Sequence, residues 1–224
     1  MKQFVKDKIT LLQCDCLDYM KDVPDKHFDL AIVDPPYGIG MDRYLAITKP
    51  SRPNSYTYNQ KHKTKGWDKL KPEAIYFDEL FRISKDQIIC GGNYFTSFLK
   101  ETNAWIFWDK INGDGSTFSD GELIWTSFNK ALRKFRCSVF DGLHGGKDRI
   151  HPTEKPIRLY KYFLKNYATP DMKIIDTHGG SMSSMIACYD FGCKAVCCEI
   201  DEDYFDAGVK RFDNETRQLT IFQY

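Results

Sequence analysis

Short apolar runs alternate along this chain with segments of helical periodicity, and this alternation restricts the fold more than any other feature. Strands that alternate with helices are typical of a mainly parallel sheet with helices on both faces. The sequence therefore predicts an α/β fold. The expected strands are 9–13, 28–33, 87–90, 104–108, 122–128, 134–139, 173–175, 195–200 and an edge strand at 219–222. The expected helices are 17–23, 73–83, 93–99, 156–167, 183–191 and 204–212.

The length of 224 residues suits a single domain, and we find no internal repeat. The start of the chain lacks the pattern of a signal peptide, and the cysteines lie mostly in apolar segments, as in a reducing cytoplasm. No C-x-x-C pair occurs, so we expect no metal site. No apolar stretch approaches the roughly 20 residues of a membrane span. We therefore expect one cytoplasmic domain over residues 1–224.

The formal net charge of +1 conceals a basic segment at about residues 41–72. Tyrosines and a tryptophan are interspersed with its lysines and arginines. Cations that can meet phosphates, placed beside rings that can stack on bases, are typical of a nucleic-acid surface. A solvated loop with incidental aromatic residues is the alternative. On the first interpretation, the residues expected to contact nucleic acid are Arg43, Lys61, Lys63 and Lys65.

The tetrapeptide Asp34-Pro35-Pro36-Tyr37 directly follows the apolar run at 28–33, where a strand should end and the chain should turn. The prolines present carbonyl acceptors in a rigid frame, while Asp34 adds an anionic acceptor and Tyr37 an aromatic face. Such a corner suits a planar base that carries an amine. An ordinary turn is the alternative, because Asp-Pro and Pro-Pro both favour turns.

A second corner follows the expected strand at 173–175, where Asp176 precedes a glycine turn and a helix. Glycine lets the backbone approach a ligand closely, and a helix N-terminus favours an anion. Glu199 ends the next expected strand, at close to the spacing at which an acid meets a ribose diol in dinucleotide-binding folds. These features predict an adenosine site. His178 in this turn could be a ligand or a base, or could simply be tolerated there.

The segment His151-Pro152-Thr153-Glu154-Lys155-Pro156 lies between the two corners in the sequence and leads into an expected helix. Thr153 and Lys155 can offer a hydroxyl and a cation to a ligand carboxylate. Thr153 can also cap the helix, and the two interpretations are compatible.

Together these elements resemble the amino-directed DNA methyltransferases that use S-adenosylmethionine, in the motif order of the permuted β group. The resemblance implies a Rossmann-like methyltransferase fold, a catalytic motif at Asp34, Pro35, Pro36 and Tyr37, and a further family block at 91–95. For the cofactor it implies Asp15 at the adenine and Glu199 at the ribose. The other cofactor-binding residues that it implies are His151, Thr153, Lys155, Pro156, Asp176, Thr177, His178, Gly179, Gly180 and Ser181.

The chain departs from the family pattern in two places. Met182 stands where the last glycine of the family's glycine motif would be, and a side chain there is expected to crowd the methionine moiety of the cofactor. The segment before His151 that the family uses to choose its DNA site is short, at about residues 140–150. We therefore expect recognition to depend on the basic segment at 41–72 or on the second subunit of a homodimer.

The resemblance implies a site-specific enzyme of the restriction–modification type that acts on a base flipped out of double-stranded DNA. Asp34 and the Pro35 carbonyl would accept the two amine hydrogens, and Tyr37 would stack on the base. An aspartate at the first motif position favours N6 of adenine. Three alternatives stay open, namely N4 of cytosine, an amine or amide in RNA or protein, and a non-catalytic nucleic-acid-binding module.

Overall fold

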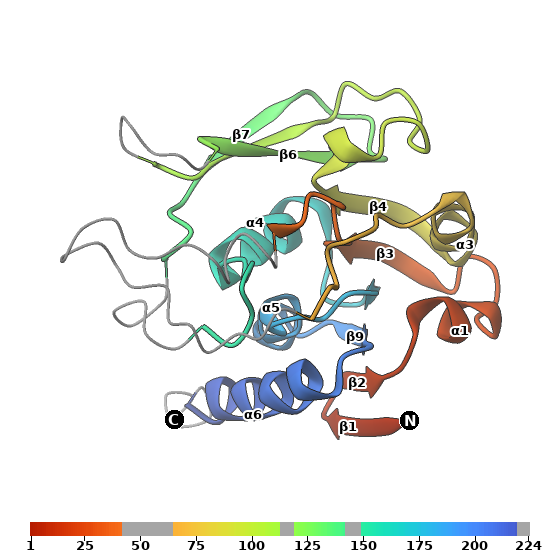
Figure 1. Cartoon of the computed structure of the whole chain (residues 1–224), viewed down its shortest axis with the longest axis vertical. Helices are drawn as coiled ribbons and strands as arrows, with labels where there is room; N and C mark the ends of the chain where they lie inside the picture. Colours follow the sequence, from red (N-terminus) through yellow and green to blue (C-terminus); the bar gives the residue numbers. More distant parts are fainter. Residues whose placement is uncertain (42–64, 113–118, 142–148, 219–224) are drawn as a thin grey trace.

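The computed structural model of the chain describes residues 1–41, 65–112, 119–141 and 149–218. In this part of the chain nine strands form one sheet, in the order β1-β2-β9-β8-β3-β4-β6-β5-β7, and Figure 1 shows it running from β1 and β2 at one end to β6 and β7 at the other. The strands are β1 (Lys2–Lys6), β2 (Ile9–Gln13), β3 (Phe28–Val33), β4 (Ser84–Cys90), β5 (Ile106–Asp109), β6 (Gly121–Thr126), β7 (Arg133–Arg136), β8 (Lys173–Asp176) and β9 (Lys194–Glu199). The helices are α1 (Cys16–Lys21), α3 (Ala74–Ile83), α4 (Ile157–Tyr167), α5 (Ser183–Phe191) and α6 (Glu202–Gln218), with a 3₁₀ turn η1 (Gly92–Tyr94).

The centre of the sheet is parallel, as the sequence predicts. β2, β9, β8, β3 and β4 pair in parallel in that order, whereas β1 and β6 add antiparallel neighbours. Beyond β6, β5 runs antiparallel to β6 and parallel to β7. The parallel strands end at one edge of the sheet, which is where open α/β sheets bind their ligands. Residues that follow β2, β3, β4, β8 and β9 therefore gather there.

β3 shows why this sheet carries helices on both faces. Successive side chains of a strand point to opposite faces, so Leu30 and Ile32 face one way and Ala31 and Val33 the other. The first pair packs in a buried cluster with residues of α4, α5 and α6, and the second pair in a cluster with residues of α1 and α3. A continuous apolar run is what a strand covered on both sides requires. The expected helix layers are confirmed.

The outermost strand β1 and the last helix α6 lie at the same end of the molecule (Figure 1). Lys2 pairs with Asp206 at 2.8 Å and Lys6 with Asp213 at 3.2 Å. The sequence analysis missed β1, because its lysines and exposed side chains hide a strand pattern. Charged residues on an edge strand also discourage pairing with another chain. Helix α6 is longer than the predicted 204–212.

The helix predicted at 93–99 is wrong. The chain forms only the short η1 after β4, entered through Gly91 at a φ of 64°. The strand predicted at 219–222 lies outside the described residues. Among the described helices, none combines the length and apolar character that crossing a bilayer requires.

Candidate active site

The corner Asp34-Pro35-Pro36-Tyr37 directly follows β3, at the edge where the parallel strands end. The Asp34 side chain is 17% exposed. The hydroxyl of Tyr37 lies 2.7 Å from Asp34 Oδ1 and 2.8 Å from Glu122 Oε1. A hydroxyl carries one proton, so it donates to one of these carboxylates at a time. The corner therefore holds a carboxylate that shares a donor with a second acid.

Lys155 reaches into the same corner. Its ammonium lies 2.5 Å from Asp34 Oδ2 and 3.2 Å from Glu122 Oε1, and it donates to the Tyr37 hydroxyl oxygen at 3.0 Å. Its side chain is 6% exposed. Lys110 approaches the other oxygen of Glu122 at 3.3 Å. The sequence analysis expects Lys155 to face a ligand carboxylate, but the structure pairs it with two carboxylates of the protein.

The charges of this cluster shift one another's pKa values. Burial raises the pKa of Asp34; Lys155 offsets this only in part, and Glu122 adds to it. Burial also acts to raise the pKa of Glu122, but Lys155 and Lys110 outweigh it and hold that pKa below its ordinary value. Burial acts to lower the pKa of Lys155, but the carboxylates of Asp34 and Glu122 raise it. Lys155 is thus a permanent cation, and Glu122 is the more acidic of the two carboxyls because two lysines face it.

Glu122 was missed by the sequence analysis. An acid at the start of an apolar strand usually marks a solvated strand end. Here β6 runs antiparallel to β4, which brings its first residues to the edge where the parallel strands end. In the described part of the chain, Asp34, Cys90 and Glu122 also offer ligand atoms within 4.8 Å of one another. The Lys155 ammonium already supplies these carboxylates with a cation.

The turn after β4 holds the ring of Tyr37. Tyr94 stacks on this ring with centroids 4.8 Å apart and an interplanar angle of 14°. Gly91 lies against the ring, since a Cβ at Gly91 would come within 2.3 Å of Tyr37 Cε1. Any side chain at position 91 would displace the ring. The block at 91–95 therefore acts on the site through Tyr37.

The glycine turn follows β8, as predicted. Asp176 is buried and accepts hydrogen bonds from the backbone N–H of His178 at 3.0 Å and from the Ser184 hydroxyl at 2.5 Å. Burial raises the pKa of Asp176 to about 7 and lowers the pKa of His178 to about 4. His178 is therefore neutral at pH 7, and its Nδ1 lies 2.9 Å from the buried Thr177 hydroxyl.

Glu199 ends β9 and fixes the glycine turn. Its carboxylate accepts from the backbone N–H of Gly180 at 2.7 Å and from that of Asp201 at 2.8 Å. Asp15 follows the neighbouring strand β2 and caps α1 by accepting from Leu17 N–H at 2.7 Å. Because Gln13 is the register partner of Glu199, the two acids stand at the ends of adjacent strands.

Met182 does not occupy the glycine turn with its side chain. It is fully buried, and its Sδ lies 3.6 Å from Cys197 Sγ. A Cβ at Gly179 would lie 2.9 Å from Met182 Cε, and one at Gly208 would lie 2.7 Å from Met182 Cγ. These glycines make room for the methionine in the core. The expectation that Met182 crowds the cofactor pocket is therefore wrong, although its φ of 60° is unusual for a residue with a side chain.

The segment at 151–156 lies against the glycine turn. A Cβ at Gly180 would lie 3.7 Å from the ring of His151, whose Nδ1 lies 3.2 Å from the Thr153 hydroxyl. The interpretation of Thr153 as a helix cap is wrong, because Pro156 occupies the N-cap position of α4. In the glycine turn itself, the side chains of Thr177 and Ser181 are buried.

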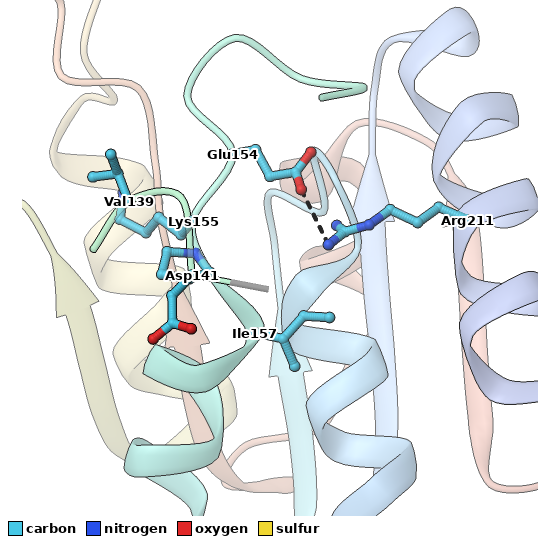
Figure 2. A pocket seen from close by; sticks show the side chains of 7 residues that line it. Val139, Asp141, Glu154, Lys155, Ile157 and Arg211 are labelled. Atoms are coloured by element: carbon cyan, nitrogen blue, oxygen red, sulfur yellow. Dashed lines mark ion pairs between the residues drawn. The ribbon is translucent and has the colours of Figure 1, made fainter. Parts of the chain in front are cut away.

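Helix α6 fastens this segment to the glycine turn. Figure 2 shows Glu154 and Arg211 pointing toward each other across a small pocket, with an ion pair of 3.1 Å. Arg211 also donates to the Ser181 carbonyl at 2.6 Å. The pocket is lined by Val139, Asp141, Glu154, Lys155, Pro156, Ile157 and Arg211. One guanidinium thus joins both predicted cofactor-side segments.

Of the basic residues expected on nucleic acid, Arg43, Lys61 and Lys63 lie outside the described residues. The ammonium of Lys65 lies 2.5 Å from Asp201 Oδ1 and 2.7 Å from Asp203 Oδ2. Its charge is therefore already balanced within the protein.

The two corners lie on neighbouring strands. β3 pairs with β8 in parallel, with Leu30 opposite Ile174 and Ala31 opposite Ile175. Asp34 and Asp176 follow these paired residues at the same edge, close enough for the charge of Asp34 to contribute to the raised pKa of Asp176 after the larger effect of burial. The structure thus brings the tetrapeptide and the glycine turn together.

Comparisons with known proteins converge on one family. The DNA methylase family model N6_N4_Mtase matches residues 100–210. The Type II methyltransferase M.HpaI of Haemophilus parainfluenzae is 22% identical over 244 aligned positions, which cover 92% of this chain and 74% of that protein. The Type II methyltransferase M1.MboII of Moraxella bovis is 31% identical, over 65% of this chain and 56% of that protein.

Solved structures share the fold. The M1.HpyAVI complex with S-adenosylmethionine superposes with a TM-score of 0.57 at 16% identity, covering 92% of this chain and 99% of that one. The cytosine-N4-specific PvuII DNA methyltransferase superposes with a TM-score of 0.62 at 13% identity, covering 94% of this chain and 91% of that one. These matches confirm the Rossmann-like methyltransferase fold predicted from the sequence.

Proposed function

We propose, from the premise that this chain belongs to the DNA methylase family of N6- and N4-directed enzymes, that it methylates the exocyclic N6 amine of adenine in DNA. The methyl donor of the family is S-adenosylmethionine. The chain as a whole, residues 1–224, would be the catalytic domain. The target adenine would be flipped out of double-stranded DNA, since a stacked base cannot enter a corner at the end of a strand.

One observation carries this proposal. The proline-framed carboxylate after β3 and the glycine turn after β8 stand at the same edge of two hydrogen-bonded parallel strands. A base held at the first and a methyl donor held at the second would meet directly. Alignment of two reactants in this way is worth about 7–11 kcal/mol in favourable cases.

The residues at the glycine turn fit the nucleoside part of S-adenosylmethionine. Glu199 holds the turn with one lone pair of each carboxylate oxygen, which leaves acceptor capacity for the hydroxyls of a ribose. Asp15 stands at the end of the adjacent strand and can accept from an adenine amine. A Cβ added at Gly180 would meet nothing nearer than the His151 ring at 3.7 Å, so the backbone of the turn is not tightly covered there. When bound, the cofactor would supply an electrophilic methyl group on a sulfonium sulfur.

The protein's own contribution would be to hold the amine. The Asp34 carboxylate and the Pro35 carbonyl would accept its two hydrogens, which draws the nitrogen toward a tetrahedral geometry and exposes its lone pair. Pro36 keeps the turn rigid, and the ring of Tyr37, supported by Tyr94, offers a face on which the base can stack. No strong base is needed before transfer, because the proton leaves after the methyl group has arrived.

Methylation of N4 of cytosine is the second candidate. The PvuII enzyme, which is cytosine-N4-specific, superposes on 94% of this chain. The aspartate at position 34 supports adenine through the family resemblance only.

Digestion of the product to nucleosides tests the proposal. Unmethylated plasmid DNA would be incubated with the protein and tritiated S-adenosylmethionine, digested, and separated beside N6-methyladenine and N4-methylcytosine nucleoside standards. We expect the label in the N6-methyladenine nucleoside. Label in the cytosine product would establish the second candidate. Absence of labelled DNA together with absence of S-adenosylmethionine binding in calorimetry would favour a non-catalytic module.

A further inference from the structure

The two donors that hold Asp34 also reach Glu122. The Tyr37 hydroxyl lies 2.7 Å from Asp34 Oδ1 and 2.8 Å from Glu122 Oε1. The Lys155 ammonium lies 2.5 Å from Asp34 Oδ2 and 3.2 Å from Glu122 Oε1. The two carboxylates therefore compete for the same hydroxyl proton and the same cation.

The proposed reaction requires Asp34 to take a new donor. Each of its oxygens already accepts one hydrogen bond, from Tyr37 or from Lys155, and these donors weaken Asp34 as an acceptor for an incoming amine, so the release of one of them would strengthen its hold on the amine. A hydroxyl released from Asp34 in this buried place would lose its acceptor, and leaving a buried donor unsatisfied is costly. Glu122 removes that cost, because its Oε1 already lies at hydrogen-bonding distance from the hydroxyl.

We propose that Glu122 is a positioning residue of the methyl-transfer site, which accepts the hydrogen bond of the Tyr37 hydroxyl and takes over more of the interaction with Lys155 when Asp34 accepts the amine. Rotation of the O–H bond about the Tyr37 C–O bond switches the hydroxyl from Asp34 to Glu122 without moving a heavy atom. This inference rests on the proposed function and deepens it, since it explains how a carboxylate with two partners becomes available to a substrate.

Glu122 also has a role once the bond is made. The nitrogen lone pair forms the new N–C bond, the electron pair of the broken S–C bond stays on sulfur, and the methylated amine carries the positive charge. One amine proton then passes to Asp34, which becomes neutral and later releases that proton to water. Lys155 and Tyr37 need an ionised acceptor during this interval, and Glu122 provides it.

The electrostatics support this division. Glu122 pairs with two lysines, Lys110 at 3.3 Å and Lys155 at 3.2 Å. Among the described residues, Asp34 pairs with Lys155 only. Burial raises the pKa of Asp34, while the two lysines outweigh burial at Glu122 and lower its pKa. Environments that push two carboxyl pKa values apart assign them different proton roles.

The test is the pH dependence of methyl transfer in a single turnover, with enzyme in excess over unmethylated plasmid DNA and with saturating tritiated S-adenosylmethionine. We expect Glu122→Gln to lower the plateau rate about 100-fold, within the range of general acid–base effects. Its acidic limb should also move to lower pH, because Asp34 loses a negative neighbour and receives both donors. Glu122→Asp, which keeps the charge, should hold the acidic limb near that of the wild type.

Asp109→Asn is the matched control. Asp109 ends β5, is 18% exposed and pairs with Lys134 and Arg136. The same carboxylate-to-amide change there should leave the rate and the pH profile unchanged.

Tyr37→Phe provides a second readout that a purely structural role of Glu122 would not move. Without the Tyr37 hydroxyl, Glu122 can no longer relieve Asp34 of that hydrogen bond. Glu122→Gln should therefore lower the rate of methyl transfer several-fold less in the Tyr37→Phe background than in the wild type. If Glu122→Gln does not fold, as thermal melting would show, the comparison of Glu122→Asp with and without the hydroxyl takes its place. Additive effects of the two changes would overturn the proposal.

The failure of this inference differs from failure of the proposed function. A wild-type protein that labels no adenine contradicts the function. A wild-type protein that labels adenine, with Glu122→Gln transferring at the wild-type rate and with the same acidic limb, contradicts only the role of Glu122. A lowered rate with an unmoved limb also overturns it, since Glu122 would then only support the fold.

Discussion

Lys155 Nζ lies 2.5 Å from Asp34 Oδ2, so the segment that the sequence assigns to the cofactor touches the corner that it assigns to the target base. These residues are 121 positions apart in the chain. The contact means that a change at either residue alters the charge at both parts of the site. Mutations must therefore be read in separate assays of cofactor binding and of methyl transfer.

Asp34→Ala should lower the rate of methyl transfer by about 10²–10⁴-fold, because the amine loses its anionic acceptor. S-adenosylmethionine affinity, measured by calorimetry, should stay within a few-fold of the wild type, since Lys155 keeps Glu122 as a partner. Asp29→Ala, at the opposite end of β3 and paired with Lys85, is the control that should retain activity. Equal losses of binding and transfer in Asp34→Ala would contradict the assigned role.

Glu199→Ala should weaken S-adenosylmethionine binding by about 10–100-fold. The variant loses the proposed ribose acceptor and the hydrogen bonds that hold Gly180 and Asp201, and a hydrogen bond to a charged group is worth about 1.5–3 kcal/mol. Calorimetry with the cofactor alone measures the effect. An unchanged affinity would remove Glu199 from the cofactor site.

Gly91→Ala should lower transfer because the new Cβ would meet the Tyr37 ring at 2.3 Å. Gly192→Ala is the matched control, since Gly192 also has a positive φ but its Cβ would meet open space. Both variants should lose roughly 1–2 kcal/mol of stability from the left-handed backbone. Only Gly91→Ala should also lower the rate of methyl transfer. Equal rates in the two variants would show that the Tyr37 ring tolerates displacement.

His178 should make the protein less stable in acid. Burial lowers its pKa to about 4 in the folded state, against about 6.5 in the unfolded chain. The unfolded state therefore takes up a proton first, so the stability that neutral His178 contributes is full above about pH 6.5 and is lost as the pH falls toward 4. We expect the wild type to lose roughly 3 kcal/mol more than His178→Asn over that interval in denaturant unfolding. Parallel losses would contradict the pKa shift.

The basic segment should divide into two parts. Reversing the charge of Lys61 and Lys63 should weaken DNA binding and flatten its salt dependence by about 0.9 for each phosphate that the protein no longer neutralises. Lys65→Glu should leave the salt slope unchanged, because Asp201 and Asp203 already neutralise Lys65. Filter binding over a range of salt concentrations measures both. A slope that responds to Lys65 and not to the other two would reverse this assignment.

The parallel core was predictable because its strands are buried on both faces and so appear as unbroken apolar runs. β3 matches its predicted bounds, and the acids at the carboxyl ends of β3, β8 and β9 follow directly from those runs. β1 was not predictable in this way, since most of its side chains are exposed and its partner β2 supplies the pattern.

The residues of the site could be predicted from the sequence only where they directly follow the end of an apolar strand. Glu122 enters through the antiparallel direction of β6, which a run of apolar residues does not reveal. The partner of Lys155, Asp34, lies in a segment distant in the sequence, so the sequence pattern does not reveal this contact. The side chain of Met182 was misjudged because the space for it comes from Gly208, on a helix that follows in the chain.

The pairing of β3 with β8 has a consequence for how such a protein can diversify. Since backbone hydrogen bonds between two neighbouring strands set the separation of the two corners, the connecting segments on the rest of that edge contribute nothing to it. A lineage built on this arrangement can replace the segments that touch neither corner, and with them the DNA sequence that it marks, while the spacing of the two corners is inherited unchanged.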